Sequence, residues 1–221
     1  MEYWLDLVMI LLLIKGAVTG YLAGAGAGAM KTVLLLPALW LAGLFSNGGA
    51  VYLETISKFD ELLKPLVASR FPLALAVSPP LGGEMAAAAL VRGLPLPPLY
   101  QERLAGMPEI MELPAGSPAL EAVIEKFTSL IILKGAFLFF FLILLIAMQI
   151  IIKLKRDNPF PPRGKLTGLL LGGLNTGIVS AFLVEAFCPF LPLFGTFVAW
   201  DISRSPVLEA LLKIAFTLGV K

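Results

Sequence analysis

Residues 166–184, LTGLLLGGLNTGIVSAFLV, form the stretch that decides the fold expected of this chain. The stretch contains no charged residue, and at about 1.5 Å of rise per residue it can cross a hydrocarbon core of roughly 30 Å. Gly168 and Gly172 are four positions apart, as are Gly173 and Gly177. Each pair lies on one face of a helix, where the missing side chains let a second helix approach closely. The stretch therefore predicts a membrane-crossing helix with a packing surface of small residues.

Three polar residues, Asn175, Thr176 and Ser180, lie among these glycines. Polar side chains inside a membrane helix often hydrogen-bond to a neighbouring helix. If several copies of this helix met, the same side chains could instead line a pore. Both interpretations stay open at the level of the sequence.

A basic loop at 153–165 precedes this helix. Five bases occur within it against a single acid, Asp157. Basic residues in short loops stay on the cytoplasmic side, so the loop is predicted to lie inside. The basic residues are Lys153, Lys155, Arg156, Arg163 and Lys165.

The composition indicates a membrane protein and gives no case for an enzyme. Hydrophobic residues make up 58% of the chain and charged residues 14%, against roughly 45–50% and 25% in soluble domains. The chain has no histidine, which removes Ser-His and Cys-His catalytic arrangements and the commonest metal ligand. A net charge of +2 is too small to argue for nucleic acid. We therefore expect no catalytic residue, no cofactor and no metal site.

The first 45 residues predict a helical hairpin across the membrane, with helices at about 4–22 and 32–45. Glycines recur from Gly16 to Gly28 and serve either as a packed helix face or as a bend. We favour a helix to about Tyr21 followed by a tight turn. Pro37 is expected to kink the second helix, and the Ser-Asn-Gly-Gly run at 46–49 is expected to end it.

The remainder divides into a long insert and a second pair of crossings. The insert, 46–128, is rich in proline and glycine, with an amphipathic helix predicted at 51–70 and a short one at 84–92. A helix starting at Ser117 and Pro118 leads into a crossing at about 129–152. The glycine-rich crossing covers about 166–186. The two crossings and the basic loop between them make up the expected segment 129–188. The segment 189–221 follows, with an amphipathic helix at 205–217 that starts on a second Ser-Pro pair.

The expected fold class is thus an all-α integral membrane protein with four transmembrane helices. The basic loop places 46–128 and both termini outside and the turn bearing Lys31 inside. The insert carries nine acidic and six basic residues, and a long segment of this kind can translocate.

Several motifs resemble the colicin V production protein family of bacterial inner-membrane proteins. Asp6 follows Leu5 at the start of the first apolar run, and Gly20, Tyr21 and Gly24 stand where that family has a glycine-tyrosine motif. The glycine-rich last crossing and the serine-led C-terminal helix are also similar. Leu22 and Ala23 depart from the family pattern, which has a basic pair there. The resemblance implies a multi-pass protein of the bacterial inner membrane, accessory to colicin V production or export or to envelope function.

Two hypotheses about function follow. In the first, the chain is non-enzymatic and acts by association in the lipid bilayer, with itself as a homo-oligomer or with other membrane proteins, through the glycine face at 168–177. In the second, several copies form a channel lined by the glycine-rich helix. Because polar residues between membrane helices often only hydrogen-bond to each other, the first is favoured.

Overall fold

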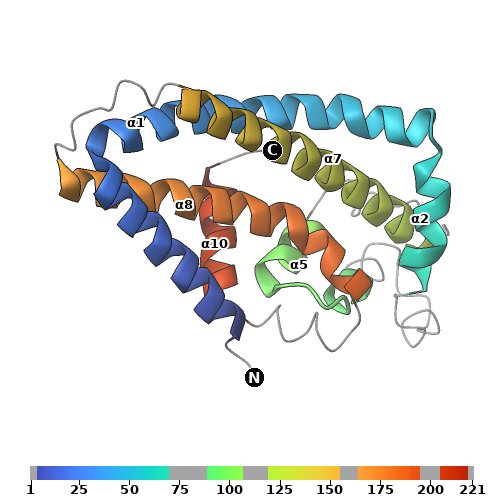
Figure 1. Cartoon of the computed structure of the whole chain (residues 1–221). Helices are drawn as coiled ribbons and strands as arrows, with labels where there is room; N and C mark the ends of the chain where they lie inside the picture. The colour runs from blue at the N-terminus through green and yellow to red at the C-terminus, as the bar shows by residue number, and fades with distance from the viewer. Residues whose placement is uncertain (1–3, 70–88, 107–118, 155–163, 195–204, 219–221) are drawn as a thin grey trace. The chain divides into compact units, whose positions relative to one another are not determined.

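The described part of the computed structural model is helical throughout, as the sequence predicts, and no strand occurs in it (Figure 1). The described residues are 4–69, 89–106, 119–154, 164–194 and 205–218. They form two units. Unit 1 comprises Met1–Ser46, Ala136–Ala186 and Ser205–Lys221, and unit 2 comprises Asn47–Gly135 and Phe187–Arg204.

The longest helix, α1 (Trp4–Thr55), consists of two helical arms that meet at Gly24. Gly24 has φ 80° and ψ 174°, a backbone conformation essentially confined to glycine because a Cβ would clash there. The predicted turn is therefore a single-residue bend, and the second arm resumes helical structure at once. This arm also passes through Pro37, which membrane helices tolerate when other groups satisfy the freed carbonyl.

The second arm of α1 does not end before Ser46, in contrast to the sequence expectation. Residues 46–49 remain helical, and α1 continues to Thr55. Ser46 donates a hydrogen bond to the Gly43 carbonyl at 2.8 Å, within its own helix, and both Ser46 and Ala50 are buried. Packing on this face outweighs the weak helix propensity of the Asn-Gly-Gly run.

Three helical stretches are long and apolar enough to cross a membrane: Leu5–Thr55, Val123–Lys153 and Lys165–Phe194. The second lies in α7 (Ala119–Leu154), and the third comprises α8 (Lys165–Phe187) with the 3₁₀ helix η2 (Cys188–Phe194). The two prolines of η2 account for the change of helix type, since proline cannot donate the backbone hydrogen bond that an α-helix needs. These stretches fit a membrane protein.

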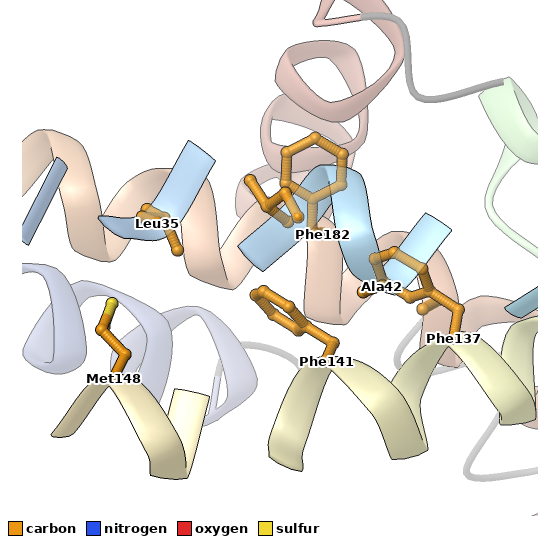
Figure 2. Close-up of a cluster of buried hydrophobic side chains, with 8 residues drawn as sticks. Leu35, Ala42, Phe137, Phe141, Met148 and Phe182 are labelled. Atoms are coloured by element: carbon orange, nitrogen blue, oxygen red, sulfur yellow. The ribbon is translucent and has the colours of Figure 1, made fainter. Parts of the chain in front are cut away.

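Unit 1 has a core made of side chains from α1, α7 and α8 (Figure 2). Phe137 and Phe141 stack with their ring centroids 5.6 Å apart, and Phe141 is fully buried. The helix α10 (Pro206–Thr217) also belongs to this unit and buries one apolar face. The core residues are Leu35, Leu39, Ala42, Phe137, Phe141, Met148, Phe182 and Ala186.

Unit 2 differs most from what the sequence predicts. The single amphipathic helix expected at 51–70 is divided: α1 ends at Thr55, and α2 (Phe59–Ala68) begins after Lys58, whose φ of 48° is left-handed. A further short helix, α5 (Pro98–Ala105), lies in the proline-rich stretch, for which short helices were expected but only the one at 84–92 was given a range. Its Gln101 side chain donates hydrogen bonds to the carbonyls of Leu94 (2.8 Å) and Leu96 (3.0 Å). Of the helix expected at 84–92, only 89–92 are described, and these are helical; Ser117 and Pro118 lie outside the described residues.

Candidate functional site

The glycines of α8 meet the glycines of α1 inside unit 1. A Cβ built on Gly20 would lie 2.2 Å from the Gly168 carbonyl oxygen and 2.7 Å from the Gly172 Cα. A Cβ on Gly168 would lie 2.7 Å from the Gly24 carbonyl carbon. Real side chains do not approach backbone atoms so closely, so the two helices cross in direct backbone contact. We call this contact of Gly20 and Gly24 with Gly168 and Gly172 the glycine crossing.

The direction of the two α1 arms follows from their contacts with α8. Along the first arm, Gly16 lies opposite Thr176 and Gly20 opposite Gly168 and Gly172, so this arm is antiparallel to α8. Along the second arm, Gly28 lies opposite Leu171 and Thr32 contacts Asn175, so this arm is parallel to α8. The bend at Gly24 therefore reverses the chain and forms a helical hairpin around α8 (Figure 1).

The remaining small residues of the predicted glycine face make ordinary contacts. A Cβ on Gly173 would lie 3.7 Å from the Ala17 Cβ, and one on Gly177 would lie 3.7 Å from the Leu13 Cδ2. All four glycines of α8 therefore face the first arm of α1, but only Gly168 and Gly172 require glycine for lack of space.

Asn175 joins α8 to the second arm of α1 through hydrogen bonds. Its side chain is buried, its Nδ2 donates to the Gly28 carbonyl at 3.2 Å, and its Oδ1 accepts from the Thr32 hydroxyl at 3.0 Å. The Thr32 hydroxyl also lies 3.1 Å from the Gly28 carbonyl. A buried amide in a membrane helix is costly unless it is paired, and here both ends of the amide have partners. No local pattern in the sequence identifies Thr32 as the partner of Asn175.

The side chains of Thr176 and Ser180 also pack within the chain. The Thr176 hydroxyl donates to the Gly172 carbonyl of its own helix at 2.9 Å, and its side chain fills the space beside Gly16. Ser180 is buried. The three polar residues considered as pore-lining thus lie among protein contacts in this single chain.

The hairpin motif residues occupy the two ends of the first arm. At the bend, the Lys165 ammonium lies 5.6 Å from the centroid of the Tyr21 ring, a cation–π distance. At the other end, Asp6 is buried and its Oδ1 accepts a hydrogen bond from the Ser205 hydroxyl and a longer one, 3.4 Å, from the Val207 amide. Asp6 and the Ser-Pro pair that starts at Ser205 both stand out in the sequence, but no sequence pattern predicts their contact.

Of the basic residues that set the predicted orientation, two are described. Lys153 is exposed in the last turn of α7, and Lys165 is the exposed first residue of α8. Lys155, Arg156 and Arg163 lie outside the described residues. A cation in the last turn of α7 interacts favourably with the negative end of the helix dipole.

The chemistry of the glycine crossing is that of packing. Its own groups are backbone atoms of α1 and α8. Beside it, the Asn175 amide pairs with Thr32 and with the Gly28 carbonyl of α1, and the Thr176 hydroxyl pairs within α8. Among the described residues, no group of three or more His, Cys, Asp or Glu side chains could hold a metal ion. Comparison of the chain with known protein families, with curated proteins and with solved structures finds no match.

Proposed function

We propose that this chain is a multi-pass protein of a bacterial inner membrane that acts by association, with itself or with other membrane proteins, and not by catalysis. The resemblance described above assigns it an accessory role in colicin V production or export or in envelope function. The observation that carries the proposal is that the glycines and the polar side chains of α8 are engaged in helix packing within the chain, as expected of a protein that acts through packing rather than through a reactive site.

The arrangement of α1 supports four crossings. Its first arm, residues 4–23, is about 30 Å long at 1.5 Å per residue, which equals the thickness of a hydrocarbon core. Residues 32–53 of the second arm contain no charge and extend about 33 Å. Since the arms run in opposite directions along α8, each arm is assigned one crossing, and α7 and α8 supply the other two.

The same contacts favour association over a channel. A pore lined by α8 needs Asn175, Thr176 and Ser180 to face water. Asn175 and Thr176 hydrogen-bond within the chain, and Ser180 is buried. Opening such a pore would require these contacts to be exchanged for contacts with water, at the cost of the interhelical hydrogen bonds.

The proposal is tested in two assays on the full chain. Purified protein in lipid vesicles should release ions and small solutes no faster than vesicles without protein. In a bacterial host whose own colicin V production protein has been deleted, the chain should restore colicin V export. Solute release above background that is reduced by Asn175→Ala would favour the channel. Failure to restore export, although the protein accumulates normally in the membrane, would exclude the accessory role.

A matched pair of variants tests whether copies of the chain associate through the glycine face or through another surface. Gly172→Leu inserts a side chain between α8 and α1, whereas Gly48→Leu lies where a Cβ meets nothing within 4 Å. Because the crossing is internal, Gly172→Leu should lower thermal stability in detergent before it changes copy number in nanodiscs. A changed copy number at unchanged stability would place the glycine face between copies.

A further inference from the structure

The helix α2 in unit 2 carries an exposed apolar edge. Phe59, Leu62 and Leu66 are 41%, 70% and 46% exposed, and their spacing of three and four residues places them on one line along the helix. Val67 on the adjacent line is buried, and Leu63 beside it is half-buried. One apolar line of α2 therefore packs in unit 2, and the line of Phe59, Leu62 and Leu66 faces outward.

The opposite side of α2 is charged and hydrated. Asp60 and Lys64 form an ion pair at 3.1 Å, and the more exposed Lys58 and Glu61 form one at 3.5 Å. Such pairs on one side, with large apolar residues on another, are typical of helices that lie along a membrane surface.

The chain leaves its membrane span just before α2. Counted from Lys31, the uncharged run of α1 ends at Glu54 after about 33 Å, which matches the hydrocarbon core of a bilayer. Glu54 accepts a hydrogen bond from the Ser129 hydroxyl of α7, which holds the end of α1 in place. Lys58 then redirects the chain, and Figure 1 draws α2 leaving the end of α1 at a steep angle.

A second uncharged run leads directly into η2, the helix that contacts α2. Counted from Lys165, the uncharged run of α8 ends at Glu185 after about 28 Å. The η2 helix follows, contacts α2, and exposes the Phe194 ring, which lies 5.4 Å from that of Phe187. Two uncharged runs with lengths close to that of a hydrocarbon core therefore lead, along the chain, into α2 and η2, and these two helices contact each other within unit 2.

We infer that α2 is an interfacial helix. It lies parallel to the membrane plane on the face opposite Lys31, with Phe59, Leu62 and Leu66 at the boundary between lipid headgroups and acyl chains. Lipid is the occupant of the exposed edge because the helix starts five residues after the end of a span and keeps its ion pairs on the polar side. This inference needs the membrane embedding of α1 and does not need the role in colicin V export.

The test uses nitroxide labels on the full chain in lipid vesicles, in a Cys188→Ala background because Cys188 is its one cysteine. Leu62→Cys places a label on the exposed apolar edge, and Glu61→Cys places a matched label on the neighbouring charged side. Leu36→Cys, on an exposed position of the α1 span, reports the lipid interior. Collision rates with oxygen, which concentrates in lipid, and with a water-soluble nickel complex are measured for each.

The ratio of the oxygen collision rate to the nickel collision rate should be several-fold higher for the Leu62 label than for the Glu61 label. It should approach the ratio measured for the Leu36 label. A nickel-dominated Leu62 label, with an oxygen-dominated Leu36 label, would place α2 in water and overturn the inference while leaving α1 in the membrane. A Leu62 label protected from both reagents would mean that protein covers this edge, and would also overturn it.

Discussion

At the scale of single residues, Gly20 has less space for a side chain than Gly168 or Gly172, its partners in the glycine crossing. In Gly20→Ala, the new methyl group would lie 2.2 Å from a backbone oxygen of α8, which cannot move without separating the helices. Overpacking of this kind costs about 1–3 kcal/mol, and we expect the midpoint of thermal unfolding in detergent, followed by circular dichroism, to fall. Gly48→Ala is the control, because its Cβ meets nothing within 4 Å. Equal stability of the two variants would contradict the glycine crossing.

The hydrogen bond between Thr32 and Asn175 is a second residue-scale test. Thr32→Val and Asn175→Ala each remove one partner of the 3.0 Å contact. In a double-mutant cycle, we expect a coupling energy of about 0.6 kcal/mol, the average for interhelical hydrogen bonds in a membrane protein, measured as free energies of unfolding in bicelles. A coupling of zero would mean that the two side chains do not meet, and would strengthen the channel hypothesis.

At the scale of an element, the reversal of α1 depends on Gly24. Gly24→Ala forces a side chain into a conformation that costs about 1–3 kcal/mol, so the two arms should no longer hold one fixed geometry. Nitroxides introduced by Leu11→Cys and Val33→Cys, at exposed positions on the two arms, report the distance between them. We expect a narrow distance distribution in the parent and a broad one after Gly24→Ala. A distribution that stays narrow and unshifted would show that glycine is not required at the bend.

The start of α10 is the second element-scale case. Ser205 is its N-cap, accepting from the Leu208 amide at 3.1 Å, and its hydroxyl donates to Asp6. Ser205→Ala removes both interactions and should cost about 1 kcal/mol, seen as faster hydrogen exchange at the first amides of α10. Asp6→Ala should speed exchange at the same amides although it lies on α1.

Thr217→Ala is the matched control for both variants, since that hydroxyl bonds only the Lys213 carbonyl near the exposed end of α10. We expect the control to leave exchange at the first turn unchanged. If Asp6→Ala also leaves it unchanged, then α10 is held by its buried leucines alone.

At the scale of the whole molecule, the orientation in the membrane is the prediction on which the others rest. The basic residues between α7 and α8 should keep that loop in the cytoplasm, and the segment containing α5 should lie outside. In a Cys188→Ala background, Glu102→Cys should react with a membrane-impermeant thiol reagent in intact cells. Asn158→Cys should react only after permeabilisation. The opposite pattern would invert the molecule and place α2 at the cytoplasmic interface.

Local signals in the sequence were sufficient to predict an all-helical chain and the apolar character of its long helices. Long uncharged runs, glycines four residues apart and a Ser-Pro pair before α10 are local signals, and each can be read from one segment. The described helices α7, α8 and α10 lie close to the ranges expected for them because hydrophobic length and helix caps act within a segment.

Which segments meet depends on tertiary packing. Periodicity identified a glycine face on α8, but several helices could have covered it, and the structure chose the first arm of α1. The pairings of Asn175 with Thr32 and of Asp6 with Ser205 join residues 143 and 199 positions apart, with no local signal. The continuation of α1 through 46–49 also depends on tertiary packing. Buried contacts there outweigh the penalty of about 1 kcal/mol that each glycine imposes on a helix. A pattern along one helix shows which of its faces is suited to packing. Which element packs on that face depends on contacts summed over the whole unit.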